Sequence, residues 1–282
     1  MKELSSWLDA KSGIEGTLGY VVIIICAILG HAWVNGSGRN DVEVEEEAVE
    51  EEEPPRNFTA MQLKHFDGTK DEKTGEDKPV YLAVKGIVFD VSSGRDFYGP
   101  GGAYEMFSGH ECGVALAKMS FDEKYIDDFS WESLNFGEKT ELDGWIEKFQ
   151  YYRSYPVKGR LVPEKSIPPS DKTVSTEELA KNDGSMEIPE GYAAAPIYVA
   201  AGGKVFDVSF GGVTFYGKDG AYSSFAGVDA SRALAKMSFD PSDIENPTIN
   251  DLTEKEKKCL DDWIKTFGER KQYPVVGILK SS

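Results

Sequence analysis

One block of roughly one hundred residues occurs twice in this sequence, and this duplication constrains the fold more than any other feature. The string ALAKMSFD stands at residues 115–122 and again at 233–240, 118 positions later. A period this long, present only twice, excludes a solenoid of short stacked units. A chain of 282 residues has room for two domains of about 100 residues. We therefore expect two complete domains of one fold, made by tandem duplication.

An apolar segment at residues 16–34 precedes the repeats. It carries no charge apart from His31, and about 19 residues suffice to cross a hydrocarbon core of about 30 Å. A cleavable signal peptide is the alternative, supported by small residues at Gly30 and Ala32. The tail before it is long and carries three acids against two lysines, which is unlike a signal peptide. We expect a single membrane anchor.

The net charge of −18 is concentrated in one run. Residues 41–53 contain nine acids and no base, and two prolines follow. Like charges repel one another, so this run predicts an extended, disordered spacer. Such acidity also argues against nucleic acid as the main partner. The expected layout is a tail (1–15), a transmembrane anchor (16–34), an acidic spacer (35–56), domain 1 (57–162), a proline-containing linker (163–173) and domain 2 (174–282).

The cysteines indicate a reducing compartment. Cys26 is in the predicted anchor, while Cys112 and Cys259 occupy non-equivalent positions in the two repeats. No disulfide framework is therefore encoded, which favours domains that face the cytosol. Asn35 and Asn57 begin formal glycosylation tripeptides, which are common by chance; glycosylation at Asn57 in cells would count against that orientation.

Each repeat predicts the same sequence of elements. A capping box starts a short helix at Thr59 and at Ser175. Short β-branched runs around a glycine-containing turn then predict a hairpin, and apolar residues at helical spacing later predict a packing helix. The hairpin strands are expected at 80–84 with 87–91 and at 197–200 with 205–208, and the helices at 142–149 and 260–267. The expected class is α+β, with short helices around a few-stranded sheet.

Signatures of an enzyme are absent from the sequence. It has no nucleophile elbow, no phosphate-binding loop, no histidine pair at metal spacing and no Cys-x-x-Cys. His65 and His110 are not repeated, because Lys181 and Val228 stand opposite them. A duplicated histidine site is excluded, and we expect a protein that is not an enzyme.

Tyrosine beside glycine is repeated outside the expected core. Each copy has two tyrosines six residues apart in a glycine-rich loop and a third far along the chain: Tyr98, Tyr104 and Tyr155, then Tyr216, Tyr222 and Tyr273. One interpretation is that these rings pack and the glycines serve turns. The other is that glycines let backbone approach a flat ligand while a phenol points at it.

These motifs resemble one known family. The strings VFDV at 88–91 and GRDFYGPGGAY at 94–104, with FAGVDAS at 225–231 and YPVVG at 273–277, closely resemble the membrane-associated progesterone receptor (MAPR) family, a branch of the cytochrome b5-like haem/steroid-binding fold. The resemblance covers nearly everything after the acidic spacer. It implies an α+β fold of two tandem cytochrome b5-like domains after an N-terminal transmembrane helix.

The resemblance also implies a cofactor site. Tyr104 and Tyr222 would be axial ligands of a five-coordinate ferric haem, in one or both domains. A phenolate is a hard anionic donor that suits ferric iron, and its usual pKa near 10 means that the metal must help to keep it ionised. The remaining tyrosines would line the pocket: Tyr98, Tyr155, Tyr216 and Tyr273.

Two departures from the family pattern concern this site. Relatives often have lysine before the late tyrosine, where this chain has Ser154 and Gln272, with Arg153 and Lys271 one residue earlier. The first domain also has HECG at 110–113 in place of a basic-Asp-Ala-Ser segment, which makes His110 and Cys112 competing ligands. Two-histidine electron transfer is not available, because the loop at 99–102 has lost the histidine of cytochrome b5.

The function that the resemblance implies is a membrane-anchored, non-catalytic haem-binding protein that supports haem-thiolate monooxygenases or sterol metabolism. A sterol or steroid is a further expected ligand, and self-association a further interaction. The expected location is the endoplasmic reticulum or another endomembrane, with a single membrane pass and the C-terminal domains in the cytosol. The alternative is a haem-independent adaptor or steroid-binding module, in which the tyrosines only pack.

Overall fold

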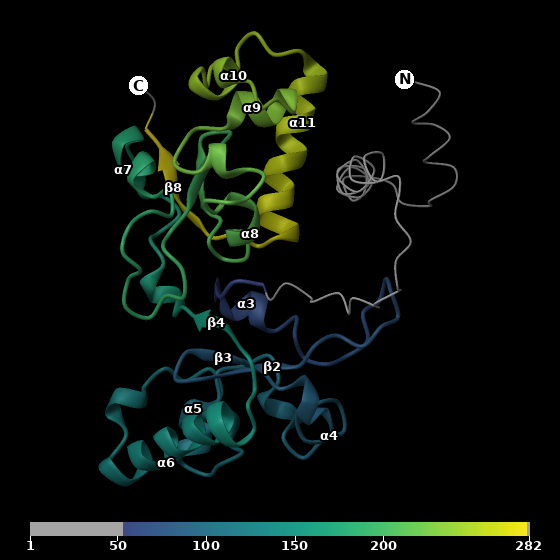
Figure 1. The fold of residues 1–282 in the computed structure, drawn as a ribbon, viewed down its shortest axis with the longest axis vertical. Helices are drawn as coiled ribbons and strands as arrows, with labels where there is room; N and C mark the ends of the chain where they lie inside the picture. The colour runs from purple at the N-terminus through teal and green to yellow at the C-terminus, as the bar shows by residue number, and fades with distance from the viewer. Residues whose placement is uncertain (1–52, 281–282) are drawn as a thin grey trace, which may run out of the picture. The chain divides into compact units, whose positions relative to one another are not determined.

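The computed structural model describes residues 53–280 of the chain (Figure 1). The predicted anchor at 16–34 and most of the predicted spacer lie outside these residues. Among residues 53–280, no helix has both the length and the apolar character needed to cross a bilayer. The anchor therefore stays a prediction.

A four-stranded mixed sheet forms the centre of each domain. In the first, β1 (Arg56–Phe58), β4 (Val157–Leu161), β3 (Ile87–Asp90) and β2 (Tyr81–Val84) lie side by side in that order. β1 runs parallel to β4 and the other pairs are antiparallel. The second sheet has the same order and pairing, with β5 (Thr173–Val174), β8 (Val275–Leu279), β7 (Lys204–Asp207) and β6 (Tyr198–Ala201). The two predicted hairpins are confirmed as β2–β3 and β6–β7.

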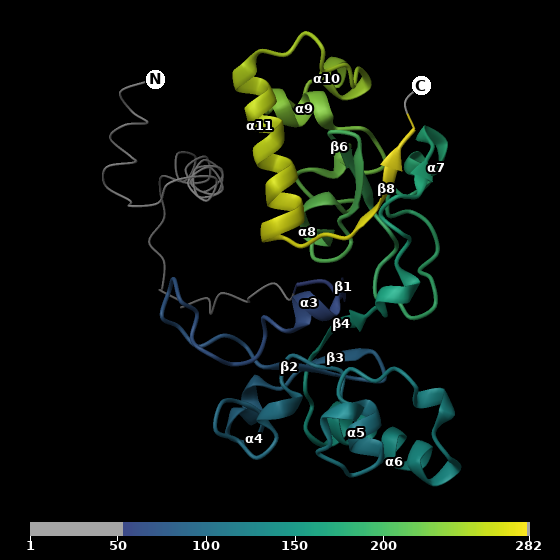
Figure 2. The same ribbon diagram turned by 180° about the vertical axis from the view of Figure 1, so that it is seen from behind.

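Short helices cover the sheets (Figure 2). The first domain has α3 (Ala60–Leu63), α4 (Arg95–Tyr98), α5 (Gly113–Ala117) and α6 (Phe136–Glu147), which continues into a π turn, η5 (Lys148–Tyr152). The second has α7 (Thr176–Lys181), α8 (Val213–Tyr216), α9 (Ser231–Lys236), α10 (Pro241–Glu245) and α11 (Glu254–Lys265), followed by the π turn η8 (Thr266–Arg270). Short 3-10 turns complete the order at η1 (Ser92–Gly94), η2 (Glu105–Phe107), η3 (Glu123–Tyr125), η4 (Trp131–Ser133), η6 (Glu164–Ser166) and η7 (Ser223–Phe225).

The predicted helix starts are confirmed by their caps. The Thr59 hydroxyl accepts from the Gln62 amide at 3.1 Å, and the Gln62 side chain accepts from the Thr59 amide. At the second start, the helix begins as predicted, but only one half of the predicted capping box is found there: the Ser175 hydroxyl accepts from the Glu178 backbone amide at 3.2 Å. Strand β5 begins at Thr173, the last residue of the predicted linker.

Alternating residues of each strand face two apolar layers, as the two-residue period of a strand requires. In β6, Val199 packs with the α9 and α11 layer, while Ala200 packs with Leu179 of α7. In β2, Leu82 likewise belongs to the apolar layer under α5 and α6, and Ala83 belongs to the layer on the other face of the sheet. The helical layer of each domain contains one edge-to-face aromatic pair between β-strand and π turn, Phe89–Phe149 at 5.4 Å and Phe206–Phe267 at 5.3 Å.

Two buried amides of the first domain form hydrogen bonds to the second. Asn57 accepts from the Ala193 amide at 2.7 Å and donates to the Ser209 hydroxyl at 2.9 Å. The Gln62 amide donates to the Phe210 carbonyl at 2.8 Å. Because the Asn57 side chain is fully buried, this fold has no room for a glycan there.

Candidate functional site

The structure brings the three repeated tyrosines of each domain together. In the first domain, the Tyr98 ring lies 5.8 Å from Tyr104 and 6.4 Å from Tyr155, centroid to centroid. In the second, Tyr216 lies 5.7 Å from Tyr222. The third ring of that domain joins the cluster through Phe267, which lies 6.1 Å from Tyr216 and 5.6 Å from Tyr273.

The three tyrosines differ in exposure, and in the same way in both domains. Tyr104 and Tyr222 are half-buried. The other four are buried, with exposed fractions of 9% for Tyr98, 6% for Tyr155, and 4% for both Tyr216 and Tyr273. Of the three tyrosines, one ring per domain is thus open to an external ligand, and it is the tyrosine that ends the glycine-rich loop.

Burial also sets the protonation of the inner tyrosines. Loss of hydration raises the pKa of Tyr273 to about 12, and raises the pKa of Tyr98, Tyr155 and Tyr216 in the same direction. These four side chains are neutral phenols at physiological pH, so they are hydrogen-bond donors rather than anionic ligands.

The repeated glycines are required by the packing of the loop itself. A Cβ at Gly94 would overlap the Tyr155 hydroxyl, and one at Gly212 would lie 3.0 Å from the Tyr273 hydroxyl. A Cβ at Gly102 or Gly220 would overlap the carbonyl of Phe97 or Phe215. None of these four glycines has a positive φ, so glycine is needed at them for space rather than for a left-handed turn, and at Gly94 and Gly212 it lets the late tyrosine approach.

A strained residue precedes the late tyrosine in both domains. Ser154 has φ of 51° and Gln272 has φ of 52°, values that few residues other than glycine adopt. Each follows a π turn, and π turns recur at functional sites. The turns hold the tyrosines by backbone bonds, from the Tyr155 amide to the Phe149 carbonyl at 3.0 Å and from the Tyr273 amide to the Phe267 carbonyl at 2.9 Å.

Exposed phenylalanines extend the aromatic surface beside each open tyrosine. Phe121 lies 5.6 Å from Tyr104, and Phe239 lies 5.6 Å from Tyr222. Their exposed fractions are 55% and 54%, so each presents an apolar face to solvent beside the open tyrosine. Neither was expected at the site from the sequence, although both belong to the repeated ALAKMSFD string.

A cation lies at the edge of each tyrosine cluster. The Arg153 guanidinium is 5.9 Å from the Phe97 ring centroid, and the Lys271 ammonium is 5.5 Å from the Phe215 ring centroid. These are the two basic residues that the sequence places one position before the expected lysine. Positive charge is thus retained beside both sites.

The unusual segment at 110–113 has a structural role. The Glu111 carboxylate accepts hydrogen bonds from the amides of Lys85 at 3.0 Å, Gly86 at 2.8 Å and Gly113 at 2.8 Å. In the second domain the Ser231 hydroxyl performs the same task, because it accepts from the Gly202 amide at 2.9 Å. Both arrangements fasten the hairpin turn to the next helix. Burial raises the pKa of Glu111 to about 7, against the effect of the three amides.

Cys112 and His110 are also engaged elsewhere. Cys112 is fully buried and its thiol donates to the Ala83 carbonyl at 3.3 Å. His110 Nδ1 lies 2.9 Å from the Asp127 carboxylate. The expectation that Cys112 competes as a ligand is therefore wrong in this fold, and His110 is held by an acid. Residues 53–280 contain no cluster of three His, Cys, Asp or Glu side chains that would hold a metal ion.

Comparison with known proteins gives one consistent result. The family model described as "Cytochrome b5-like Heme/Steroid binding domain" matches residues 63–161 and 175–276. Probable steroid-binding protein 3 of Arabidopsis thaliana is 46% identical over 105 residues, which cover 37% of this chain and 97% of that protein. Cytochrome P450 regulator dap1 of Schizosaccharomyces pombe is 35% identical over 139 residues, or 46% of this chain and 79% of that protein.

A third relative spans more of the chain. Membrane-associated progesterone receptor component 2 of Rattus norvegicus is 29% identical over 196 residues, which cover 65% of this chain and 84% of that protein. The chain therefore belongs to the cytochrome b5-like haem/steroid-binding domain family, in its MAPR group, and carries the domain in two copies.

Proposed function

We propose that this protein binds ferric haem through Tyr104 and Tyr222 and acts as a regulatory binding protein. The observation that supports this most directly is the single open phenol in each tyrosine cluster. Its two neighbouring tyrosines are buried, so each site offers one accessible phenol oxygen as a ligand, in surroundings that are otherwise aromatic.

The residues present fit such a group. When bound, the ferric iron would supply the charge that stabilises the phenolate form of the ligating tyrosine. The flat apolar faces of Phe121 and Phe239 border the open tyrosines at 5.6 Å. Arg153 and Lys271 provide cations at the rim. The chain's own residues thus offer an oxygen ligand, an apolar wall and positive charge.

The names of the relatives support a regulatory role. One is a cytochrome P450 regulator and others are membrane steroid-binding proteins. We propose accordingly that the chain is anchored by residues 16–34 in the endoplasmic reticulum or another endomembrane, with both domains in the cytosol, and that it supports haem-thiolate monooxygenases or sterol metabolism. Carbonate extraction of membranes would test the anchor. The full chain should resist extraction, and a variant that lacks residues 16–34 should be extracted.

The test of haem binding is a titration with hemin followed by absorption spectroscopy. The wild-type protein is expected to give a high-spin ferric spectrum that Tyr104→Phe combined with Tyr222→Phe abolishes. Tyr151→Phe is the matched control, because Tyr151 is 75% exposed and lies outside the cluster. An unchanged spectrum in the double variant would refute the proposal.

A haem-independent steroid-binding module is the second candidate, favoured by the names of several relatives. In that case purified protein would contain no stoichiometric iron. A steroid probe such as progesterone would bind with an affinity that Tyr104→Phe and Tyr222→Phe leave unchanged.

A further inference from the structure

A cavity of about 230 Å³ lies between the start of the first domain and the glycine-rich loop of the second. Two cations, Arg56 and Lys271, and one acid, Glu53, line it, together with apolar side chains that include Val213 and Phe215. At about 30 Å³ for each water molecule, the volume is that of several waters and suits a small organic molecule. None of the six repeated tyrosines lines it.

Arg56 lines this cavity with its guanidinium against two aromatic rings. Its guanidinium carbon lies 4.3 Å from the Phe58 ring centroid and 5.6 Å from that of Phe66. An aromatic face supports the cation but accepts none of its in-plane N–H groups. Among residues 53–280, no carboxylate lies within 4 Å of Arg56.

Partial burial favours a counter-charge beside Arg56. Arg56 is half-buried, and loss of hydration lowers its pKa from the usual value, while Glu53 acts in the opposite direction. A cation that has left water needs a counter-charge to recover the lost hydration energy. A planar guanidinium recovers it best from a carboxylate, which it binds with two parallel hydrogen bonds.

The loop of the second domain is adapted to this arginine. Gly211 has φ of 113°, and a Cβ there would lie 2.5 Å from Arg56 Nη1. The first domain has Ser93 at the corresponding position. Its own loop arginine, Arg95, already has acceptors, because it donates to the Lys78 carbonyl at 3.0 Å and pairs with Asp77 at 3.5 Å.

Hydrogen bonds between the domains fix the backbone that carries both cations. Asn57, next to Arg56, is bonded to Ser209 and Ala193 as described above. The Gln62 amide donates to the backbone carbonyl of Lys271 at 2.9 Å. The cavity is lined by residues of both domains.

We propose that this cavity binds a small organic carboxylate, with Arg56 as the bidentate partner of the carboxylate and Lys271 as a second cation. The apolar part of the ligand would lie against Val213 and Phe215. The site requires residues of both domains, contains none of the six repeated tyrosines, and shares Lys271 and Phe215 with the rim of the second tyrosine cluster.

Isothermal titration of the full-length chain with sodium benzoate at low ionic strength tests the proposal. We expect one benzoate per chain, and binding weaker by at least about tenfold in Arg56→Gln and in Lys271→Gln, because each loses a charge-assisted contact. Glu53→Gln should bind more tightly, because it removes the one acid of the cavity. Benzamide, which has the shape of benzoate without its charge, should bind at least about tenfold more weakly.

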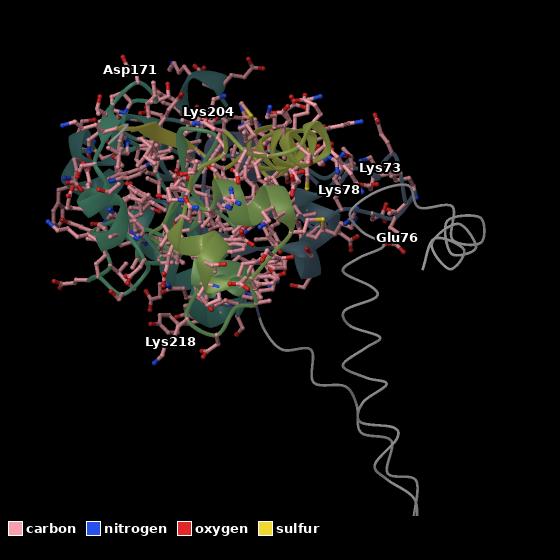
Figure 3. The ribbon with its side chains drawn as sticks, turned by 90° about the horizontal axis from the view of Figure 1, so that it is seen from above. Lys73, Glu76, Lys78, Asp171, Lys204 and Lys218 are labelled. Carbon is pink, nitrogen blue, oxygen red and sulfur yellow. The ribbon has the colours of Figure 1, made fainter. Side chains whose placement is uncertain are left out.

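Lys218→Gln is the matched control, since Lys218 belongs to the same loop, does not line the cavity and points into solvent (Figure 3). It loses the same charge, so its affinity should equal that of the wild type. No binding of benzoate, equal affinities for benzoate and benzamide, or an unchanged affinity in Lys271→Gln would each overturn the proposal. If Arg56→Gln does not fold, the affinity of the wild type for benzamide and the affinity of Glu53→Gln for benzoate still decide the question.

Discussion

The side-chain amide of Gln62 in the first domain donates a hydrogen bond to the backbone carbonyl of Lys271 in the second, at 2.9 Å. The same amide donates to the Phe210 carbonyl, while its oxygen accepts from the Thr59 amide. One buried side chain thus caps helix α3 and fixes the segment that leads into Tyr273. Its counterpart Glu178 bonds only within its own domain.

Replacing Gln62 by alanine should destabilise the protein and loosen the contact between its domains. The loss leaves buried carbonyls without a donor, which we expect to lower the free energy of unfolding by about 1–3 kcal/mol. Urea denaturation followed by tryptophan fluorescence would measure it. Glu178→Ala is the matched control, because it removes the equivalent helix-start residue from an exposed ion pair and should lower the same free energy by less than about 1 kcal/mol. Equal losses in the two variants would contradict the cross-domain role.

Alanine at Gly94 should disturb the first tyrosine cluster. The added Cβ overlaps the Tyr155 hydroxyl, so we expect a loss of about 1–3 kcal/mol in the free energy of unfolding and weaker hemin binding. Gly144→Ala is the control, since nothing lies within 4 Å of its Cβ and it is inside helix α6. That variant should gain about 0.5–1 kcal/mol. Thermal denaturation of both proteins would decide, and a neutral Gly94→Ala would show that Tyr155 is not held against this glycine.

The stability of the protein should fall as pH rises from about 4.5 to about 7, in part because of Glu111. Burial raises the pKa of Glu111 from 4.5 to about 7 in the folded protein. Between these values the folded state binds more protons than the unfolded state, so the free energy of unfolding decreases with rising pH and levels off above about 7.

Comparison with Glu111→Gln isolates this contribution. The variant lacks the titrating group, so its free energy of unfolding should change less between pH 5 and pH 7 than that of the wild type. The difference between the two proteins should be roughly that of one group whose pKa is higher in the folded than in the unfolded state. Some slope should remain, because burial also raises the pKa of Asp207 to about 7. Parallel curves for the two proteins in urea titrations at several pH values would exclude Glu111 as a source.

The repeated features of this fold were predictable from the sequence, and the unrepeated ones were not. The hairpins, the Thr59 cap and the two tyrosine clusters depend on local patterns that occur in both copies. The bonds of Asn57 and Gln62 join residues more than a hundred positions apart, and no counterpart in the other copy marks them. Phe121 and Phe239 were missed for a different reason: a repeated phenylalanine reads as core, and only the structure shows that both are exposed.

Both domains, rather than one, should bind haem. The departure at residues 110–113 casts doubt on the first site in the sequence, but Glu111 fastens the same hairpin turn as Ser231, and Tyr104, like Tyr222, is half-buried and lies beside the first loop tyrosine and an exposed phenylalanine. Since each domain has its own open tyrosine, iron analysis of hemin-reconstituted protein is expected to give about two irons per chain in the wild type, as two tyrosinate ligands imply. Tyr104→Phe and Tyr222→Phe should each retain about half of that iron. Full retention in Tyr104→Phe, with complete loss in Tyr222→Phe, would mean that the first domain keeps the fold and the tyrosines without the site.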